Sequence, residues 1–265
     1  MVSPALALLR FTAFCLWTLL LVPPYLLLRV ISHRVAGRFV VAYWRGVMRL
    51  IGFKVVTHGA PAAALGPVLF VANHASYLDI IVLGGLIPAC FIAKAEVAGW
   101  PGFGFLARLA RTVFVDRRPA ATARERDGIR RRLEHGDSLI LFAEGTSNDG
   151  NGVLPFKSAL LSVAEAALPA ADGADHPLPV QPVSLAYTRL DGLPLGRAFR
   201  PYFAWYGDMT LAGHLFRALG LGRVTIEVMF HPPTTLAAFP SRKDLASHCH
   251  AQVAGGVATL LAGRA

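Results

Sequence analysis

The amino-terminal part of this 265-residue chain carries an apolar stretch that strongly limits how the chain can fold. Residues 11–28 contain no charged side chain, and as a straight helix they would extend about 27 Å, close to the roughly 30 Å hydrocarbon core of a bilayer. Pro23 and Pro24 interrupt the stretch, because a proline inside a helix removes a hydrogen bond and clashes with the preceding turn. We therefore expect the helix to end or kink there. A kinked span and a shallow helical hairpin in one leaflet are both possible, and the hairpin is preferred. A cleaved signal peptide is a further alternative, although no good small-residue cleavage site follows before the arginines.

Charge is distributed unevenly along the chain. The first acidic residue is Asp79, and the basic residues before it are Arg10, Arg29, Arg34, Arg38, Arg45, Arg49 and Lys54. Arg38, Arg45 and Arg49 recur at helical spacing, with aromatic and aliphatic residues between them. The pattern predicts an amphipathic helix at an anionic membrane surface, with an ordinary domain helix as the alternative. If the preceding stretch enters the bilayer, its flanking cations place the rest of the chain at the cytoplasmic face of the inner (plasma) membrane.

The remainder of the chain has the pattern of an α/β domain. With 54% hydrophobic and 16% charged residues, the composition excludes intrinsic disorder. Short apolar runs predict strands at 68–72, 89–93, 112–115, 139–143, 180–187 and 224–230. Helices are expected between them at 79–86, 120–135 and 157–168, and a last helix is expected to begin near Ser241. We expect a central, mostly buried sheet flanked by helices over 61–265, preceded by a membrane-associated helical segment over 1–60.

Polar residues follow the first of these predicted strands. His74 and Asp79 would lie about 140° apart on one continuous helix, but they can meet if His74 lies in the turn and Asp79 in the first helical turn. A carboxylate that holds an imidazole fixes its tautomer and makes it a better general base. The alternative is structural, because Ser76 and Asp79 also have the spacing of a helix cap.

Two further predicted strands also end in polar residues, at Asp116 and Arg117 and at Glu144, Gly145 and Thr146. Open α/β sheets place ligand-binding groups at the carboxyl ends of strands, although a plain turn and a solvated strand end are the alternatives here. The three cysteines have no zinc-ligand spacing, so no metal site is expected. There is also no nucleophile elbow or phosphate-binding Walker loop.

Taken in order, these blocks resemble the glycerolipid acyltransferase family, of the lysophosphatidic acid (1-acyl-sn-glycerol-3-phosphate) acyltransferase type. The blocks are Asn73, His74 and Asp79; then Lys94, Glu96, Trp100, Pro101, Gly104 and 114–117; then Glu144, Gly145, Thr146, Phe156 and Lys157; and finally 180–183. Four positions depart from the family's pattern. Arg111 and Ala159 replace glycines, Ala143 replaces a proline, and Ser147 stands where an arginine often follows the third block.

The resemblance implies transfer of a fatty acyl chain from a thioester donor to the free hydroxyl of 1-acyl-glycerol-3-phosphate, giving phosphatidic acid. It implies that His74 acts as the general base and that Asp79 orients it. The acceptor would be bound by Arg117, Glu144, Gly145, Thr146 and Lys157. The expected partners are membrane lipids and the donor, a thioester of acyl-carrier protein or coenzyme A. Neither a further cofactor nor a nucleic acid is expected.

Two other functions remain open from the sequence. The acceptor could be a lyso-aminolipid such as lyso-ornithine lipid, and the missing arginine at Ser147 favours this because such an acceptor has no phosphate. The chain could also be a non-catalytic membrane-surface binding protein with a decayed site. The presence of His74, Asp79 and the third block counts against that reading.

Overall fold

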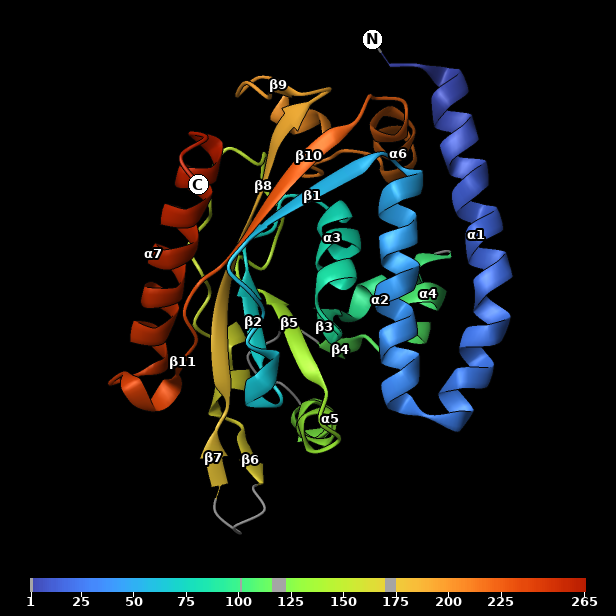
Figure 1. Ribbon diagram of the computed structural model, residues 1–265. Helices are drawn as coiled ribbons and strands as arrows, with labels where there is room; N and C mark the ends of the chain where they lie inside the picture. Colours follow the sequence, from blue (N-terminus) through green and yellow to red (C-terminus); the bar gives the residue numbers. More distant parts are fainter. Residues whose placement is uncertain (1, 101, 116–122, 170–174) are drawn as a thin grey trace.

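A mixed sheet forms the centre of the protein (Figure 1). The structure is a computed structural model that describes residues 2–100, 102–115, 123–169 and 175–265. Nine of the described strands belong to this sheet, whose main path runs β1 (Phe53–His58), β10 (Val224–Phe230), β8 (Pro179–Leu190), β2 (Leu69–Ala72), β5 (Ser138–Phe142), β3 (Ala89–Lys94) and β4 (Val113–Val115). The short strands β9 (Leu193–Pro194) and β11 (Thr234–Thr235) pair with β8. A separate hairpin is formed by β6 (Ala167–Pro169) and β7 (Asp175–Pro177).

The middle of the sheet is parallel and buried on both faces. Strand β2 lies between β8 and β5 and runs parallel to both. Alternate side chains of β2 enter two different cores, with Phe70 and Ala72 on one face and Leu69 and Val71 on the other. Since both faces are covered, these strands are mostly apolar, which made them recognisable in the sequence. The expected α/β fold, with a central sheet flanked by helices, is confirmed.

Helices cover the two faces of the sheet in different ways (Figure 1). The face of Phe70 packs against α3 (Leu78–Leu86) and α6 (Leu211–Leu219). The opposite face packs against α5 (Ala123–Glu134), the 3-10 helix η3 (Leu160–Glu165) and α7 (Arg242–Leu261). The remaining short helices are η1 (Ala63–Leu65), η2 (Ala95–Gly99), α4 (Phe103–Leu109), η4 (Arg200–Tyr202) and η5 (Leu236–Ala238).

The amino-terminal segment is an antiparallel pair of helices, α1 (Pro4–Ile31) and α2 (His33–Leu50). Helix α1 runs through Pro23 and Pro24, so the expectation that the helix ends or kinks at the prolines places the break too early. The chain turns instead at Ser32, whose amide donates to Leu28 O at the end of α1 and whose hydroxyl accepts from Val35 N at the start of α2. A capping serine therefore ends the first helix, and the prolines are accommodated within it.

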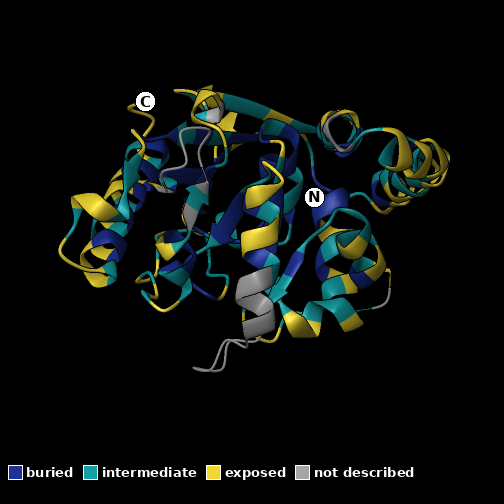
Figure 2. Cartoon of the chain, turned by 90° about the horizontal axis from the view of Figure 1, so that it is seen from below, coloured by how far each residue is buried: buried dark blue, intermediate teal, exposed yellow. Residues whose placement is uncertain are grey.

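The outer face of α1 is apolar and exposed. Within the described residues, α1 is the one helix that is long and apolar enough to cross a bilayer, and little of it is buried. Figure 2 shows its exposed surface at the edge of the molecule. The exposed large side chains on α1 are Leu8, Leu9, Phe11, Leu16, Leu19, Leu20, Leu26, Leu27, Val30 and Ile31. A continuous apolar face of this size on a protein surface indicates association with a membrane.

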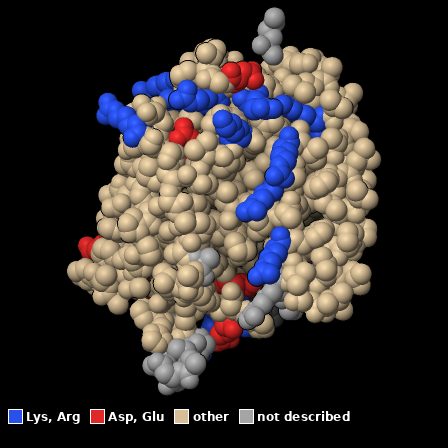
Figure 3. Space-filling view, in the orientation of Figure 1, with Lys and Arg blue, Asp and Glu red and all other residues tan. Residues whose placement is uncertain are grey.

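Helix α2 has one face on the domain and one face toward solvent. Gly84 and Gly85 of α3 allow close packing, because a Cβ at these positions would lie 2.6 Å from Trp44 Cδ1 and 2.4 Å from Met48 Cε. Beside this packed face Arg38, Arg45 and Arg49 are exposed, as their spacing predicts, and basic side chains extend over α2 in Figure 3. Arg45 Nε also donates to Gly85 O at 2.8 Å, close to the carboxyl end of α3.

Two parts of the chain differ from the sequence-based expectations. Strand β1 lies within residues 1–60, which were assigned to the membrane segment, yet it pairs in parallel with β10 along its whole length. The helix expected over 157–168 is replaced by η3 and β6. Lys157 N donates to Ala143 O at the exit of β5, and the following amides bond three residues back, so this attachment overrides the helical pattern.

Candidate active site

The turn between β2 and α3 brings His74 and Asp79 together. His74 lies in the turn and Asp79 in the first turn of α3, and His74 Nδ1 donates to Asp79 Oδ2 at 3.0 Å. The same oxygen accepts from Ala75 N at 2.8 Å and from Ser76 N at 2.9 Å. The carboxylate thus closes the turn and holds the imidazole at once, so the capping and catalytic interpretations of this motif are compatible.

The hydrogen bond to Asp79 determines which ring nitrogen of His74 can act as a base. Because a carboxylate only accepts, the proton lies on Nδ1 and leaves Nε2 as a free acceptor. The His74 side chain is 20% exposed, whereas that of Asp79 is 0% exposed. One face of the imidazole stacks on Phe142, with ring centroids 3.9 Å apart. The imidazole is therefore held on one side and accessible on another, as a general base must be.

Asn73 ties this turn to the neighbouring strand. Its Nδ2 donates to Leu185 O at 2.9 Å, and its Oδ1 accepts from Leu185 N at 2.8 Å. The side chain is buried and mimics a pair of backbone hydrogen bonds beyond the end of β2. The position of His74 is therefore set by β8 as well as by β2.

Glu144 holds the turn from the other side. Its carboxylate is buried, with Oε1 accepting from His74 N at 2.6 Å and Oε2 accepting from Asn148 Nδ2 at 2.6 Å and Leu154 N at 2.8 Å. Burial raises the pKa of Glu144 above its ordinary value, although these three donors act in the opposite direction. The sequence predicts a substrate-binding role for Glu144, but its carboxylate lies below the surface and holds the backbone of His74.

The other predicted binding residues have different positions. Gly145 is buried with a positive φ of 75°, and the exposed Lys157 side chain passes directly over it. Thr146 is exposed beside it. These three positions remain predictions for acceptor binding, and Arg117 lies outside the described residues.

Arg111 is remote from this site. It has a φ of 62°, in the left-handed region that favours glycine, which explains why a glycine is usual at this position. Its guanidinium pairs with both oxygens of Asp137, at 2.6 and 3.1 Å. Asp137 precedes β5, so the pair lies at the amino end of that strand, whereas His74 follows the carboxyl end of β2. Arg111 therefore does not compensate for the arginine that is absent at Ser147.

Aromatic side chains lie beside the turn between β2 and α3, called the catalytic turn below for the role proposed for His74. The Trp205 ring makes edge contacts with Tyr77 and Trp100, at centroid distances of 5.9 and 5.7 Å, and Tyr77 contacts Phe103 at 6.2 Å. Trp205 N donates to Ala75 O at 2.8 Å, and the Ser147 hydroxyl donates to Trp205 O at 2.5 Å. Trp205 follows η4, far from the motifs in sequence, so no local pattern pointed to it.

A buried histidine next to this cluster predicts an acid-sensitive stability. His214 Nδ1 lies 3.0 Å from the Tyr77 hydroxyl, and burial lowers the pKa of His214 to about 4. Between pH 6.5 and 4 the unfolded chain takes up a proton that the folded protein does not. The free energy of unfolding should therefore fall by about 2 kcal/mol as the pH drops through this range.

Urea unfolding across that pH range measures this dependence, with His214→Asn as the matched variant. We expect the variant to lose this part of the pH dependence. Identical slopes in the two proteins would contradict the assignment to His214.

Within the described ranges there is no cluster of three or more His, Cys, Asp or Glu side chains that could hold a metal ion. The site instead pairs a buried carboxylate with an accessible imidazole base, at the carboxyl end of a parallel strand and next to a helix pair with an exposed apolar face. Such a pair is chemically able to take a proton from a hydroxyl group or a water molecule.

Comparison with known proteins identifies the reaction. The profile of the family described as Acyltransferase matches residues 54–186, and the chain belongs to this family. It is 44% identical to a lyso-ornithine lipid O-acyltransferase of Brucella abortus, over 84% of this chain and 82% of that protein. It is 38% identical to the enzyme of the same name in Rhizobium meliloti, over 78% and 71% of the two chains.

Two other comparisons involve acyltransferases with a different named acceptor. A 1-acyl-sn-glycerol-3-phosphate acyltransferase of Neisseria meningitidis is 33% identical, over 73% of this chain and 71% of that protein. The crystal structure of the 1-acyl-sn-glycerophosphate acyltransferase PlsC from Thermotoga maritima has a TM-score of 0.64 and 22% identity, and the match covers 97% of this chain and 95% of that one. The structural likeness confirms the fold. The protein is an acyltransferase of lipid metabolism, as the sequence motifs predicted.

Proposed function

We propose that this acyltransferase moves a fatty acyl chain from a thioester donor to the hydroxyl of a lyso-aminolipid, with lyso-ornithine lipid as the acceptor. The observation that carries the proposal is the turn after β5, where Ser147 replaces the usual arginine and donates its hydroxyl to Trp205 O. A phosphate is best bound by a cationic fork, which this position does not supply. The higher identity to lyso-ornithine lipid O-acyltransferases, at 44% and 38% against 33%, supports the same acceptor.

The aromatic side chains beside the catalytic turn also favour an acceptor that carries an amine. Tyr77, Trp100, Phe103 and Trp205 form a cluster at the start of α3. An ammonium group is attracted to the face of an aromatic ring, whereas a phosphate is not. The head group of lyso-ornithine lipid contains an amino acid with a side-chain amine, so this cluster suits it better than it suits 1-acyl-glycerol-3-phosphate.

The proposed chemistry uses the free nitrogen of His74. Nε2 removes the proton of the acceptor hydroxyl as its oxygen attacks the thioester carbonyl carbon. A C–O bond forms, the C–S bond breaks, and the thiolate takes the proton back from the imidazolium. Asp79 stabilises the imidazolium and keeps its Nδ1 oriented. No covalent acyl-enzyme is needed, because the acceptor is itself the nucleophile.

An assay of the purified full-length protein with two acceptors and two donors tests this proposal. Lyso-ornithine lipid and 1-acyl-glycerol-3-phosphate are each supplied with palmitoyl-acyl-carrier protein and with palmitoyl-coenzyme A. We expect kcat/KM to be at least about tenfold higher for lyso-ornithine lipid, since each charged contact contributes roughly that factor. Ser147→Arg should shift the ratio toward 1-acyl-glycerol-3-phosphate. Equal or higher kcat/KM with 1-acyl-glycerol-3-phosphate in the unchanged protein would overturn the acceptor assignment.

We further propose that the enzyme sits at the cytoplasmic face of the inner membrane, where both thioester donors are present. Helix α1 contributes its apolar face, and α2 presents Arg38 and Arg49 to anionic head groups. Each such cation contributes about 1 kcal/mol of binding to an anionic surface.

Replacing Arg38 and Arg49 together by glutamine is therefore expected to weaken binding to anionic vesicles about 30-fold. Binding to zwitterionic vesicles, measured in the same co-sedimentation assay, should not change. Arg242→Gln with Lys243→Gln, at the start of α7 across the sheet, removes the same charge as a control. Unchanged binding of the α2 variant to anionic vesicles would refute the role of this face.

A further inference from the structure

The carboxylate of Asp79 has a second oxygen whose partner no sequence motif predicted. While Oδ2 accepts from His74 and from two backbone amides, Oδ1 accepts from the Tyr187 hydroxyl at 2.7 Å. Among the residues that the structure describes, Tyr187 is the sole donor recorded to Oδ1. A buried carboxylate oxygen without a donor is strongly unfavourable, so this contact is needed to keep Asp79 in place.

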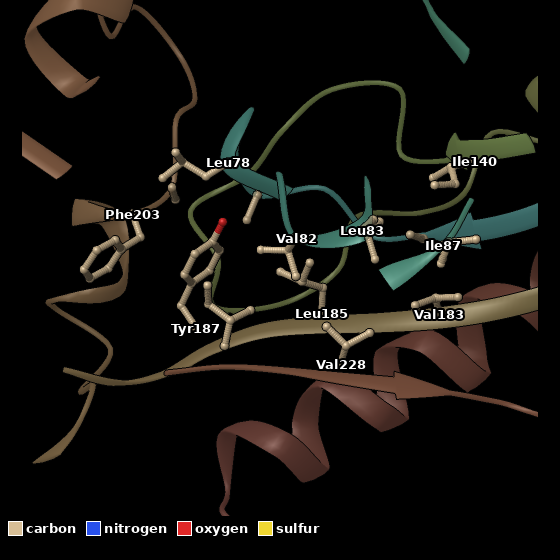
Figure 4. Packing of buried hydrophobic residues seen from close by; sticks show 14 of the residues in the cluster. Leu78, Val82, Leu83, Ile87, Ile140, Val183, Leu185, Tyr187, Phe203 and Val228 are labelled. Atoms are coloured by element: carbon tan, nitrogen blue, oxygen red, sulfur yellow. The ribbon is translucent and has the colours of Figure 1, made fainter. Parts of the chain in front are cut away.

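Three features of the surrounding structure place the Tyr187 hydroxyl against Asp79. Along β8 its side chain lies on the same face as Val183 and Leu185, because strand side chains alternate. Its ring stacks on Phe203, with centroids 5.7 Å apart and planes 6° from parallel. Figure 4 shows this stack and the hydroxyl directed toward the start of α3 near Leu78. The register of β8 beside the catalytic turn is itself held by the two hydrogen bonds between Asn73 and Leu185.

The Tyr187 hydroxyl can only donate in this position. Complete burial and the adjacent Asp79 carboxylate raise the pKa of Tyr187 well above its ordinary value, so the phenol keeps its proton. A fixed donor on Oδ1 has two effects. It restrains rotation of the carboxylate, and it draws part of the negative charge away from the oxygen that faces His74.

We propose that Tyr187 is a positioning residue for acyl transfer, which acts through Asp79 to orient His74 and to moderate its basicity. The inference rests on His74 being the base of the proposed function. Tyr187 is 2% exposed and its hydroxyl bonds Asp79, so we expect it to act through the carboxylate rather than by binding either substrate.

The test is Tyr187→Phe, which removes the hydroxyl and keeps the ring. We expect kcat to fall about tenfold or more, while KM for donor and for acceptor each change less than about twofold. Ser184→Ala is the matched control, because it removes a buried hydroxyl from the opposite face of the same strand, where it bonds His231 and Val253. The control should lose stability and keep kcat. An unchanged kcat in Tyr187→Phe, or an equal loss in Ser184→Ala at the same folded fraction, would overturn the proposal.

A second variant covers the case in which Tyr187→Phe does not fold. Placing 3-fluorotyrosine at position 187 by codon suppression keeps the ring and makes the hydroxyl a stronger donor. Asp79 then carries less negative charge and stabilises the imidazolium of His74 less. The acidic limb of the pH profile of kcat/KM should therefore move to lower pH. Tyr187→Phe, when folded, should move the limb to higher pH. An acidic limb that stays at the same pH with 3-fluorotyrosine at position 187 would contradict the proposal.

The other ionisable groups around the pair do not interfere with this comparison. They are Glu144 and Lys157 after β5, Tyr77 and His214 beside α3, and Arg200 in η4. None of them differs between the proteins compared, so a displaced limb reports the change at Tyr187. If His74→Ala retains activity, the proposed function fails. If His74→Ala is inactive while Tyr187→Phe behaves as wild type, only the present inference fails.

Discussion

Replacing His74 by alanine is expected to lower kcat for acyl transfer by about 10²–10⁴-fold, the usual contribution of a general base. The reason is geometric: Nδ1 is committed to Asp79, Nε2 is free, and the imidazole is the accessible member of the pair. The fold should survive, since the turn is also held by Asn73 and by the amides that bond Asp79. The measurement is steady-state acyl transfer with saturating donor and acceptor, on protein whose unfolding transition matches wild type.

His58→Ala is the control for that experiment. His58 Nε2 pairs with Glu227 Oε2 at 2.9 Å, so it is a second histidine–carboxylate pair, but it lies on the edge strand β1 away from the catalytic turn. Its removal should leave kcat unchanged. Near wild-type acyl transfer by the His74 variant would disprove the assignment of the base.

Asp79→Asn is expected to reduce kcat by a similar factor, about 10²–10⁴-fold, with little change in KM. An asparagine fills the same space but has no charge to stabilise an imidazolium, and its amide can present an N–H where His74 needs an acceptor. Because Asp79 is fully buried, it makes no contact with either substrate that could alter KM. The kcat and KM values for donor and acceptor, determined separately, check the prediction. Glu227→Gln, in the control pair, should keep both parameters, and a large rise in KM for the Asp79 variant would assign Asp79 to binding.

Much of the sheet could be predicted from the sequence because its strands are buried on both faces. Each of the runs predicted around residues 70, 90, 114, 140, 184 and 227 is a strand. Strand β1 escaped prediction since it is an edge strand of mixed polarity next to the apolar helices. At the amino end, two prolines suggested a break, whereas helix α1 continues to the cap at Ser32. A proline destabilises the helix that contains it, but a long helix with favourable packing can still form through the proline.

The candidate site was likewise only partly predictable from the sequence. The five-residue spacing of His74 and Asp79 allowed a histidine–carboxylate pair but also a helix cap, and the resemblance of the ordered blocks to the acyltransferase family favoured the catalytic interpretation. The residues around this pair come from other segments, and no spacing in the sequence places them there. Tyr187 bonds Asp79, Phe142 stacks on His74, and Trp205 bonds the backbone of Ala75. Closeness in sequence can also mislead. Arg111 is close to the second block in sequence, but it lies at the other end of the sheet, where it is paired with Asp137.

The sequence by itself therefore determined the class of fold and the apolar, basic amino end, because both depend on periodicity and composition within short segments. It also identified the pair of residues proposed for catalysis, through the ordered blocks that resemble the acyltransferase family. Only the tertiary structure decided what surrounds that pair. The parallel pairing of β2 with β8 and β5 brings Tyr187 to one oxygen of Asp79 and Glu144 to the backbone of His74. These contacts join residues 70 or more positions apart, and their geometry follows from strand register and packing rather than from any local pattern.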